Sequence, residues 1–211
     1  MAIRNIIFDL CGPIITIDCG LIDRAFRDYG VNIEGNIYDT ICREDYVSAF
    51  EEGRIEVRDF CSSVRQTLNT TLADDVICSI WNTLIVDMPK DNIITISRVR
   101  EHYKTFLLSN SDIINATFFA DSLKATMGAD VMKSCFVEVF FSHSLGARKP
   151  SAEAFCRIID SHHLRVEETL FIDDTLRHIE GARALGLHTL HLTGAKTLSD
   201  YFDSSGRLLS L

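Results

Sequence analysis

The feature that most constrains the fold is a short apolar run near the start that ends in an aspartate. Ile6, Ile7 and Phe8 have the character of a buried strand, and Asp9 follows them directly. Gly12 comes soon after and predicts a turn. Open α/β sheets place their chemistry at the C-terminal ends of parallel strands. The sequence therefore predicts an α/β fold with a polar site beside Asp9.

After Pro89, short apolar strands alternate with helices. Strands are predicted at 105–108, 137–141, 169–172 and 187–192. Helices are predicted at 93–103, from 113 onward, and at 152–161, 179–185 and 196–202. Strands that alternate with helices imply a parallel sheet with helices on both faces.

The segment between the first strand and Pro89 shows a different pattern. Its apolar residues recur at helical spacing, for example at 21–26, 46–50 and 57–64, and it lacks a clear buried strand. We therefore predict an inserted helical domain at 14–89, and an α/β core built from 1–13 and 90–211.

Composition argues against several classes of function. The formal charge of −9 disfavours broad attraction to nucleic acid or to an anionic membrane, so an anionic substrate needs a local positive site. Seven cysteines without a C-x-x-C pair disfavour a disulfide framework or a zinc site, and favour a reducing, cytoplasmic compartment. No signal peptide and no membrane-spanning apolar run is apparent. The oligomeric state has no signal in the sequence.

Polar side chains follow four of the predicted strands, and the ends of these strands meet at one edge of a parallel sheet. The residues are Asp9, Ser109 with Asn110, Arg148 with Lys149, and Asp173 with Asp174. An aspartate such as Asp9 can attack phosphorus and form an acyl-phosphate. A lysine and a serine can bind the phosphate oxygens, and carboxylates form a hard oxygen site suited to Mg²⁺. The metal would reduce the repulsion between nucleophile and phosphate.

Four segments, taken together and in this order, resemble the motifs of the haloacid dehalogenase-like hydrolase superfamily. They are Phe-Asp-Leu-Cys-Gly at 8–12, Leu-Leu-Ser-Asn at 107–110, Arg-Lys-Pro at 148–150, and Phe-Ile-Asp-Asp at 171–174 with its continuation at 179–186. The helical insertion resembles the small helical cap of this family, and 50–55 resembles its phenylalanine-glutamate-x-glycine segment. The resemblance covers nearly the whole chain. Within the superfamily, the chain is similar to the subgroup of bacterial sugar-phosphate phosphatases.

The resemblance implies a Rossmann-like core with an inserted helical cap, and a role for each motif residue. Asp9 is implied as the nucleophile, with Ser109 and Lys149 as the other catalytic groups. The implied phosphate-binding residues are Ser109, Asn110, Lys149, Arg148, Cys11 and Gly12. The implied Mg²⁺ ligands are Asp9, the backbone carbonyl of Cys11, and Asp174, with Asp173 as the supporting acid. We expect substrate specificity to reside in the cap at 46–58.

Three positions depart from the family pattern. Cys11 replaces the aspartate that serves as general acid and base, and loss of such help typically costs about 10²–10⁴-fold in rate. The sugar-phosphate subgroup often has glycine there, so activity does not require that aspartate. Pro13 removes one backbone N–H from the loop. His178 stands where the fourth motif usually has asparagine.

We predict a Mg²⁺-dependent phosphatase that hydrolyses a small phosphorylated metabolite, such as a sugar phosphate, through an aspartyl-phosphate. One alternative is a catalytically impaired binding or regulatory protein that keeps the fold, which Cys11 and Pro13 motivate. A 2-haloacid dehalogenase is a second alternative. Dehalogenases also lack an acid at position 11, but they have no use for paired acids such as Asp173 and Asp174.

Overall fold

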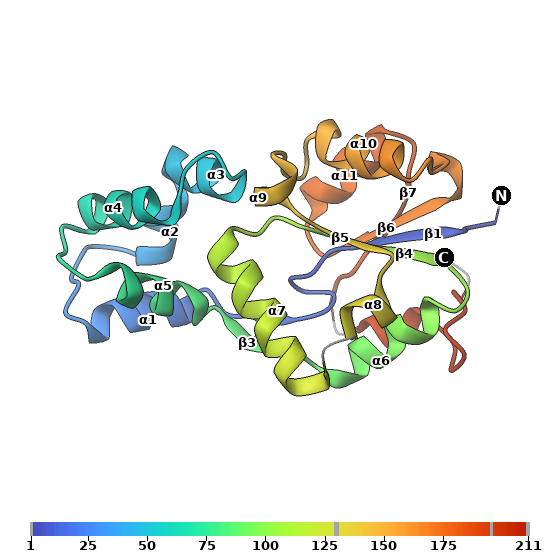
Figure 1. Ribbon diagram of the computed structural model, residues 1–211, viewed down its shortest axis with the longest axis horizontal. Helices are drawn as coiled ribbons and strands as arrows, with labels where there is room; N and C mark the ends of the chain where they lie inside the picture. Colours follow the sequence, from blue (N-terminus) through green and yellow to red (C-terminus); the bar gives the residue numbers. More distant parts are fainter. Residues whose placement is uncertain (1, 129–130, 195, 210–211) are drawn as a thin grey trace.

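A five-stranded parallel sheet forms the core, with strand β1 at its centre (Figure 1). The structure is a computed structural model that describes residues 2–128, 131–194 and 196–209. The strands are β1 (Asn5–Phe8), β4 (Lys104–Ser109), β5 (Glu138–Phe141), β6 (Thr169–Asp173) and β7 (His188–His191), in the order β5-β4-β1-β6-β7. The predicted parallel α/β core is confirmed.

Alternate residues of β1 enter two separate hydrophobic cores, one on each face of the sheet. Ile6 and Phe8 pack on the side of α6 and α7, whereas Ile7 packs on the side of α10 and α11. The four helices are α6 (Lys90–Val99), α7 (Ile113–Met127), α10 (Ala152–Ser161) and α11 (Leu176–Ala184). Figure 1 shows the two pairs on opposite sides of the sheet. Because both faces are covered, β1 is apolar throughout its run from Ile6 to Phe8.

The smaller core elements were harder to predict. They are α8 (Val131–Cys135), α9 (Ser142–Leu145), and the 3₁₀ turns η1 (Val166–Glu168) and η2 (Leu198–Tyr201). The helix expected near 196–202 is shorter than predicted and of the 3₁₀ type, since η2 covers only four residues. Thr197 and Asp200 form a capping box at its N-terminus. Phe202 is already extended and bridged to Leu208, which ends the helix after Tyr201.

Five helices lie between two short connecting strands and form the inserted helical cap (Figure 1). They are α1 (Gly20–Asp28), α2 (Ile37–Cys42), α3 (Asp45–Glu51), α4 (Val57–Leu68) and α5 (Asp74–Asn82). The connecting strands β2 (Thr16–Ile17) and β3 (Ile85–Asp87) pair antiparallel. Both are short and mostly exposed, which is why no apolar run predicted them. The predicted boundaries of the insertion, 14 and 89, stay a prediction.

The cap has a hydrophobic core of its own, built around stacked aromatic rings. The ring of Phe60 stacks on Phe50 with centroids 4.3 Å apart and meets the edge of Trp81 at 5.1 Å. Phe60 is fully buried, and Trp81 also reaches the α/β core, where its indole donates a hydrogen bond to Asp112 at 2.9 Å. The aromatic cluster therefore shapes the cap and ties it to the start of α7.

Replacing Phe60 by alanine should destabilise the cap strongly. Loss of a large buried ring typically lowers the free energy of unfolding by about 3–5 kcal/mol. Phe118→Ala is the control, because Phe118 is 39% exposed on α7 and its loss should cost only about 1–2 kcal/mol. Urea unfolding followed by circular dichroism measures both. Equal losses in the two variants would contradict this packing.

Candidate functional site

The ends of three neighbouring strands bring acidic and hydroxyl groups to one edge of the sheet. Asp9 follows β1, while Ser109 ends β4 and Asp173 ends β6 on either side of it. The backbone N–H of Asp9 donates to the carbonyl of Ile172 at 2.8 Å, which sets the two aspartates side by side. All three side chains are buried. The convergence predicted from the strand ends is therefore present for these residues.

A buried lysine lies between two of the acids. The Nζ atom of Lys149 is 2.5 Å from Oδ1 of Asp9 and 2.8 Å from Oδ2 of Asp173. Carboxylate oxygens of Asp9, Asp173 and Asp174 all lie within 4.8 Å of one another. Three carboxylates around one ammonium group leave a formal surplus of two negative charges. A divalent cation with oxygen ligands fits this donor set.

The charges of this cluster follow from burial and mutual attraction. Burial lowers the pKa of Lys149, but Asp9 and Asp173 outweigh that effect and raise it, so the lysine is charged. Asp173 has a lowered pKa despite its burial, because His178 and Lys149 stabilise its carboxylate. Burial raises the pKa of Asp9 to about 7 against the pull of Lys149, with Asp173 adding repulsion. Burial, followed by repulsion from Asp173, also raises the pKa of Asp174. An added cation would favour the ionised form of both raised acids.

The Asn110 side chain holds the backbone of Lys149 rather than facing the acids. Its amide nitrogen donates to the carbonyl of Lys149 at 2.9 Å, and its amide oxygen accepts from the N–H of Lys149 at 2.8 Å. The guanidinium of Arg148 lies on the cap, on Ser48 and Glu51. Asn110 and Arg148, both predicted to bind phosphate, thus bind other groups of the protein in this structure.

Ser109 belongs to a short chain of hydroxyl groups. Its Oγ lies 2.9 Å from Oγ of Ser111, and the N–H of Ser111 donates to Oγ of Ser142 at 3.0 Å. The N-cap of α7 is Asp112, which accepts from the N–H groups of Ile114 and Asn115. Sequence reasoning missed Ser111, Asp112 and Ser142. An aspartate directly before the helical run is a signal for the N-cap of a helix. No feature of the sequence indicated Ser142.

His178 supports Asp173 from beneath the site. Its Nδ1 lies 3.1 Å from Oδ2 and 3.2 Å from Oδ1 of Asp173, and the side chain is buried. The N–H of Thr175 donates to Oδ1 of the same carboxylate at 2.7 Å. Asp173 therefore faces a lysine, a histidine and a backbone amide, which fix its orientation.

The loop after Asp9 turns tightly against Asp174. Gly12 has a φ of +95°, and its N–H donates to the carbonyl of Ile15 at 2.9 Å. A Cβ at this position would lie 2.2 Å from Oδ2 of Asp174, so only glycine lets the carboxylate come this close. The amide of Asn92 in α6 donates to the carbonyls of Pro13 and Ile14, which anchors the loop.

The thiol of Cys11 is enclosed beside the acids. Burial is the main cause that raises its pKa above the ordinary cysteine value, and repulsion from Asp9 adds to it. Cys11 therefore carries its proton at neutral pH and does not act as an anion there. This protonated thiol stands at the position where the resemblance described above predicts an aspartate.

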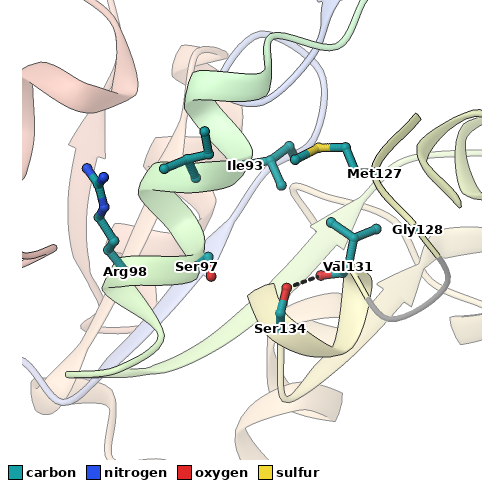
Figure 2. Close-up of a pocket in the computed structure, with 8 residues that line it drawn as sticks. Ile93, Ser97, Arg98, Met127, Gly128, Val131 and Ser134 are labelled. Atoms are coloured by element: carbon teal, nitrogen blue, oxygen red, sulfur yellow. Dashed lines mark hydrogen bonds between the residues drawn. The ribbon is translucent and has the colours of Figure 1, made fainter.

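Two pockets near the core differ in their relation to this cluster. One, of about 660 Å³, opens onto Asp174 and Gly12 and is lined by polar and apolar groups in similar measure. Another, of about 590 Å³, lies between α6, α8 and the end of α7, with Ile93, Met127 and Val131 on its walls (Figure 2). Gly12 and Asp174 line the first pocket, whereas none of the predicted site residues lines the second. We therefore assign the first pocket to the candidate site. Among the described residues, no helix is long and apolar enough to cross a membrane.

Comparisons with known proteins find similarity over most of the chain. Residues 3–186 match the model of a hydrolase family described as haloacid dehalogenase-like hydrolase. A D-ribitol-5-phosphate phosphatase from Bacteroides thetaiotaomicron is 25% identical over 187 residues, which cover 89% of this chain and 90% of that protein.

Solved structures extend the likeness. A HAD family enzyme from the same organism, in complex with magnesium and inorganic phosphate, superposes with a TM-score of 0.83 at 25% identity over 95% of this chain and all of that chain. The L-2-haloacid dehalogenase of Xanthobacter autotrophicus, 16% identical, shares the fold with a TM-score of 0.61 over 90% of this chain and 77% of that chain.

Replacing Gly12 by alanine should weaken Mg²⁺ binding. The new Cβ would push Asp174 away, and changes that displace a metal ligand typically cost about 10–100-fold in affinity. Gly30→Ala is the matched control, because Gly30 has a similar φ of +84° but no atom within 4 Å of the added carbon. Calorimetric titration with Mg²⁺ measures both variants. Identical affinities would show that Asp174 does not hold the metal.

Proposed function

Because the chain belongs to the haloacid dehalogenase-like hydrolase family, we propose that it is a Mg²⁺-dependent phosphatase that forms an aspartyl-phosphate on Asp9. The observation that carries this proposal is the contact of Asp9 with the charged, buried Lys149 beside Asp173 and Asp174. A nucleophilic carboxylate, a fixed positive charge and a divalent-metal donor set lie together there. Phosphoryl transfer needs these three things most, since it depends chiefly on positioning and electrostatics.

Each residue has a defined part in the proposed reaction. Asp9 attacks phosphorus and forms the aspartyl-phosphate as the bond from phosphorus to the leaving oxygen breaks, and this oxygen takes a proton from water to leave as the alcohol. A water molecule then hydrolyses the aspartyl-phosphate, which releases inorganic phosphate and restores the Asp9 carboxylate. Lys149 and the hydroxyl of Ser109 bind the phosphate oxygens, while Asn110 keeps Lys149 in place. Asp9, Asp174 and the carbonyl of Cys11 would hold Mg²⁺, with Asp173 as the supporting acid. The metal supplies charge neutralisation between nucleophile and phosphate.

The substrate class we propose is a small polar phosphoester, with sugar and polyol phosphates first. The relative named for D-ribitol 5-phosphate covers nearly the same length as this chain. The pocket beside Asp174 supports this choice, because its lining is rich in hydroxyl and amide groups suited to a polyhydroxy leaving group. These groups belong to Thr16, Asn92, Thr193, Thr197 and Ser199.

The two alternatives have less support. Asp9, Lys149, Asp173 and Asp174 are all present and lie close together, and the relative that covers nearly the same length as this chain is a phosphatase, which favours turnover over an impaired binding protein. The likeness to a haloacid dehalogenase concerns the fold, and a dehalogenase has no use for the acidic pair Asp173 and Asp174 at the end of β6. The phosphatase is therefore the function that the site supports best.

We also propose a cytoplasmic location and no nucleic-acid or membrane partner. All seven cysteines are free, which suits a reducing compartment. The net charge of −9 keeps polyanions away from the surface in general.

Replacing Asp9 by asparagine should abolish turnover. Without the nucleophile, Mg²⁺-dependent phosphate release from a panel of sugar phosphates, polyol phosphates and nucleotides should fall by more than about 10³-fold. Asp75→Asn, a change of an exposed acid in the first turn of α5, is the control and should leave the rate unchanged. Equal rates for wild type and the Asp9 variant would exclude the proposed mechanism.

Replacing Cys11 by aspartate should speed turnover. A carboxyl group there can protonate the leaving alcohol and then activate water, which the protonated thiol cannot do as well. We expect kcat to rise by up to about 10²-fold with unchanged Mg²⁺ affinity, because the metal uses the backbone carbonyl. Steady-state kinetics with a calorimetric Mg²⁺ titration tests this. An unchanged or lower kcat would mean that the proton comes from another group.

A further inference from the structure

Arg148 precedes the catalytic Lys149 in sequence, but its side chain leaves the acidic cluster and crosses to the cap. One terminal nitrogen donates to Oγ of Ser48 at 2.6 Å, and the other lies 2.8 Å from Oε2 of Glu51. Ser48 and Glu51 are three residues apart on α3 and so share one face of that helix. The planar fork of a guanidinium presents a separate nitrogen to each partner, whereas a lysine has one nitrogen and does not match this fork.

A second bond joins the same cap residue to the serine segment of the site. The hydroxyl of Ser142 donates to the backbone carbonyl of Glu51 at 2.5 Å and accepts from the N–H of Ser111 at 3.0 Å. Oγ of Ser111 in turn lies 2.9 Å from Oγ of Ser109. Ser142 is fully buried, so water does not compete for these bonds. The cap is thus linked to Ser109 as well as to Lys149.

The backbones of cap and core also meet at this seam. A Cβ on Gly53 would lie 2.1 Å from the carbonyl oxygen of His143, at the start of α9. The cap turn after α3 therefore rests directly on the segment that leads to Arg148. Shape and hydrogen bonding together define one contact between α3 and α9, which we call the α3–α9 seam (Ser48, Glu51, Gly53, Ser142, His143 and Arg148).

We infer that Arg148 is a positioning residue, which docks the cap on the core through Ser48 and Glu51 and thereby fixes the segment that carries Lys149. The inference rests on the proposed role of Lys149 in phosphate binding. It assigns Arg148 to the cap contact instead of to the phosphate. Since the seam also reaches Ser109, opening of the cap releases the supports of both phosphate-binding side chains together. Phosphate affinity therefore depends on cap closure.

The test uses the full chain and two readouts. Hydrogen–deuterium exchange of peptides 45–54 and 142–149 reports docking without any chemistry, and calorimetric titration with inorganic phosphate in the presence of Mg²⁺ reports the site. The variants are Arg148→Met, Arg148→Lys, Glu51→Gln and the double variant Arg148→Met with Glu51→Gln. Glu52→Gln is the matched control, because Glu52 forms its ion pair with exposed Arg54 within the cap. Emission of Trp81, the only tryptophan, shows whether each variant keeps its folded cap.

Docking through Arg148 predicts faster exchange at both peptides in every variant except the control. Phosphate affinity should fall by about tenfold in Arg148→Met and in Glu51→Gln alike. The double variant should lose no more than the worse single variant, because both changes break one contact. Arg148→Lys keeps the charge and should still lose docking.

Two results would overturn the inference. Unchanged exchange in Arg148→Met and Glu51→Gln would show that the seam does not hold the cap. Loss of phosphate affinity in Arg148→Met alone would make Arg148 a direct phosphate ligand. If wild type releases phosphate from no phosphoester, the proposed function fails, but the exchange measurement still decides whether Arg148 docks the cap.

Discussion

The structure depends on one buried lysine. Lys149 is 1% exposed and charged, and its ammonium group is held by Asp9 from one strand end and Asp173 from another. A charge in that position is tolerated only if it is fully paired, and removal of one partner typically costs about 3–5 kcal/mol. The two aspartates therefore hold the lysine in the fold, and the lysine keeps two carboxylates close together. The same three side chains provide the proposed nucleophile, phosphate binder and supporting acid.

Strand order makes this cluster possible. β1 lies between β4 and β6, so Asp9 has Ser109 on one side and Asp173 on the other, although Asp9 and Lys149 are 140 residues apart in sequence. The cap is inserted after β1 and touches the core again at α7 and at the α3–α9 seam. An insertion at this point places the cap over the polar edge without disturbing the sheet. The strand order therefore brings the polar residues together, and the position of the insertion places the cap beside them.

The sequence predicted those parts of the fold that depend on neighbouring residues along the chain. Buried strands such as 169–172 are continuous apolar runs, and the acids after them mark the strand ends, so the sheet and the residues at its edge could be predicted. Side-chain partners could not, because they depend on which distant segments meet. Asn110 bonds to the backbone of Lys149, Arg148 contacts the cap, and the indole of Trp81 donates a hydrogen bond to the N-cap residue of α7. No spacing in the sequence predicts these contacts. The strands β2 and β3 were not predicted because they are short and mostly exposed, and therefore form no apolar run.

Burial and the surplus of acid in the cluster raise the pKa of two of its carboxyl groups, Asp9 and Asp174. With three carboxylates near one ammonium group, burial and repulsion hold the pKa of Asp9 near 7, and its ionised form is poorly stabilised by the protein alone. A bound cation would stabilise that form and leave Asp9 as a carboxylate beside the phosphate. Despite the burial of Asp173, His178 and Lys149 lower its pKa, so the raised carboxyl pKa values of the cluster are those of Asp9 and Asp174. The protein therefore stabilises the Asp173 carboxylate with its own groups, whereas a bound cation would stabilise the carboxylates of Asp9 and Asp174.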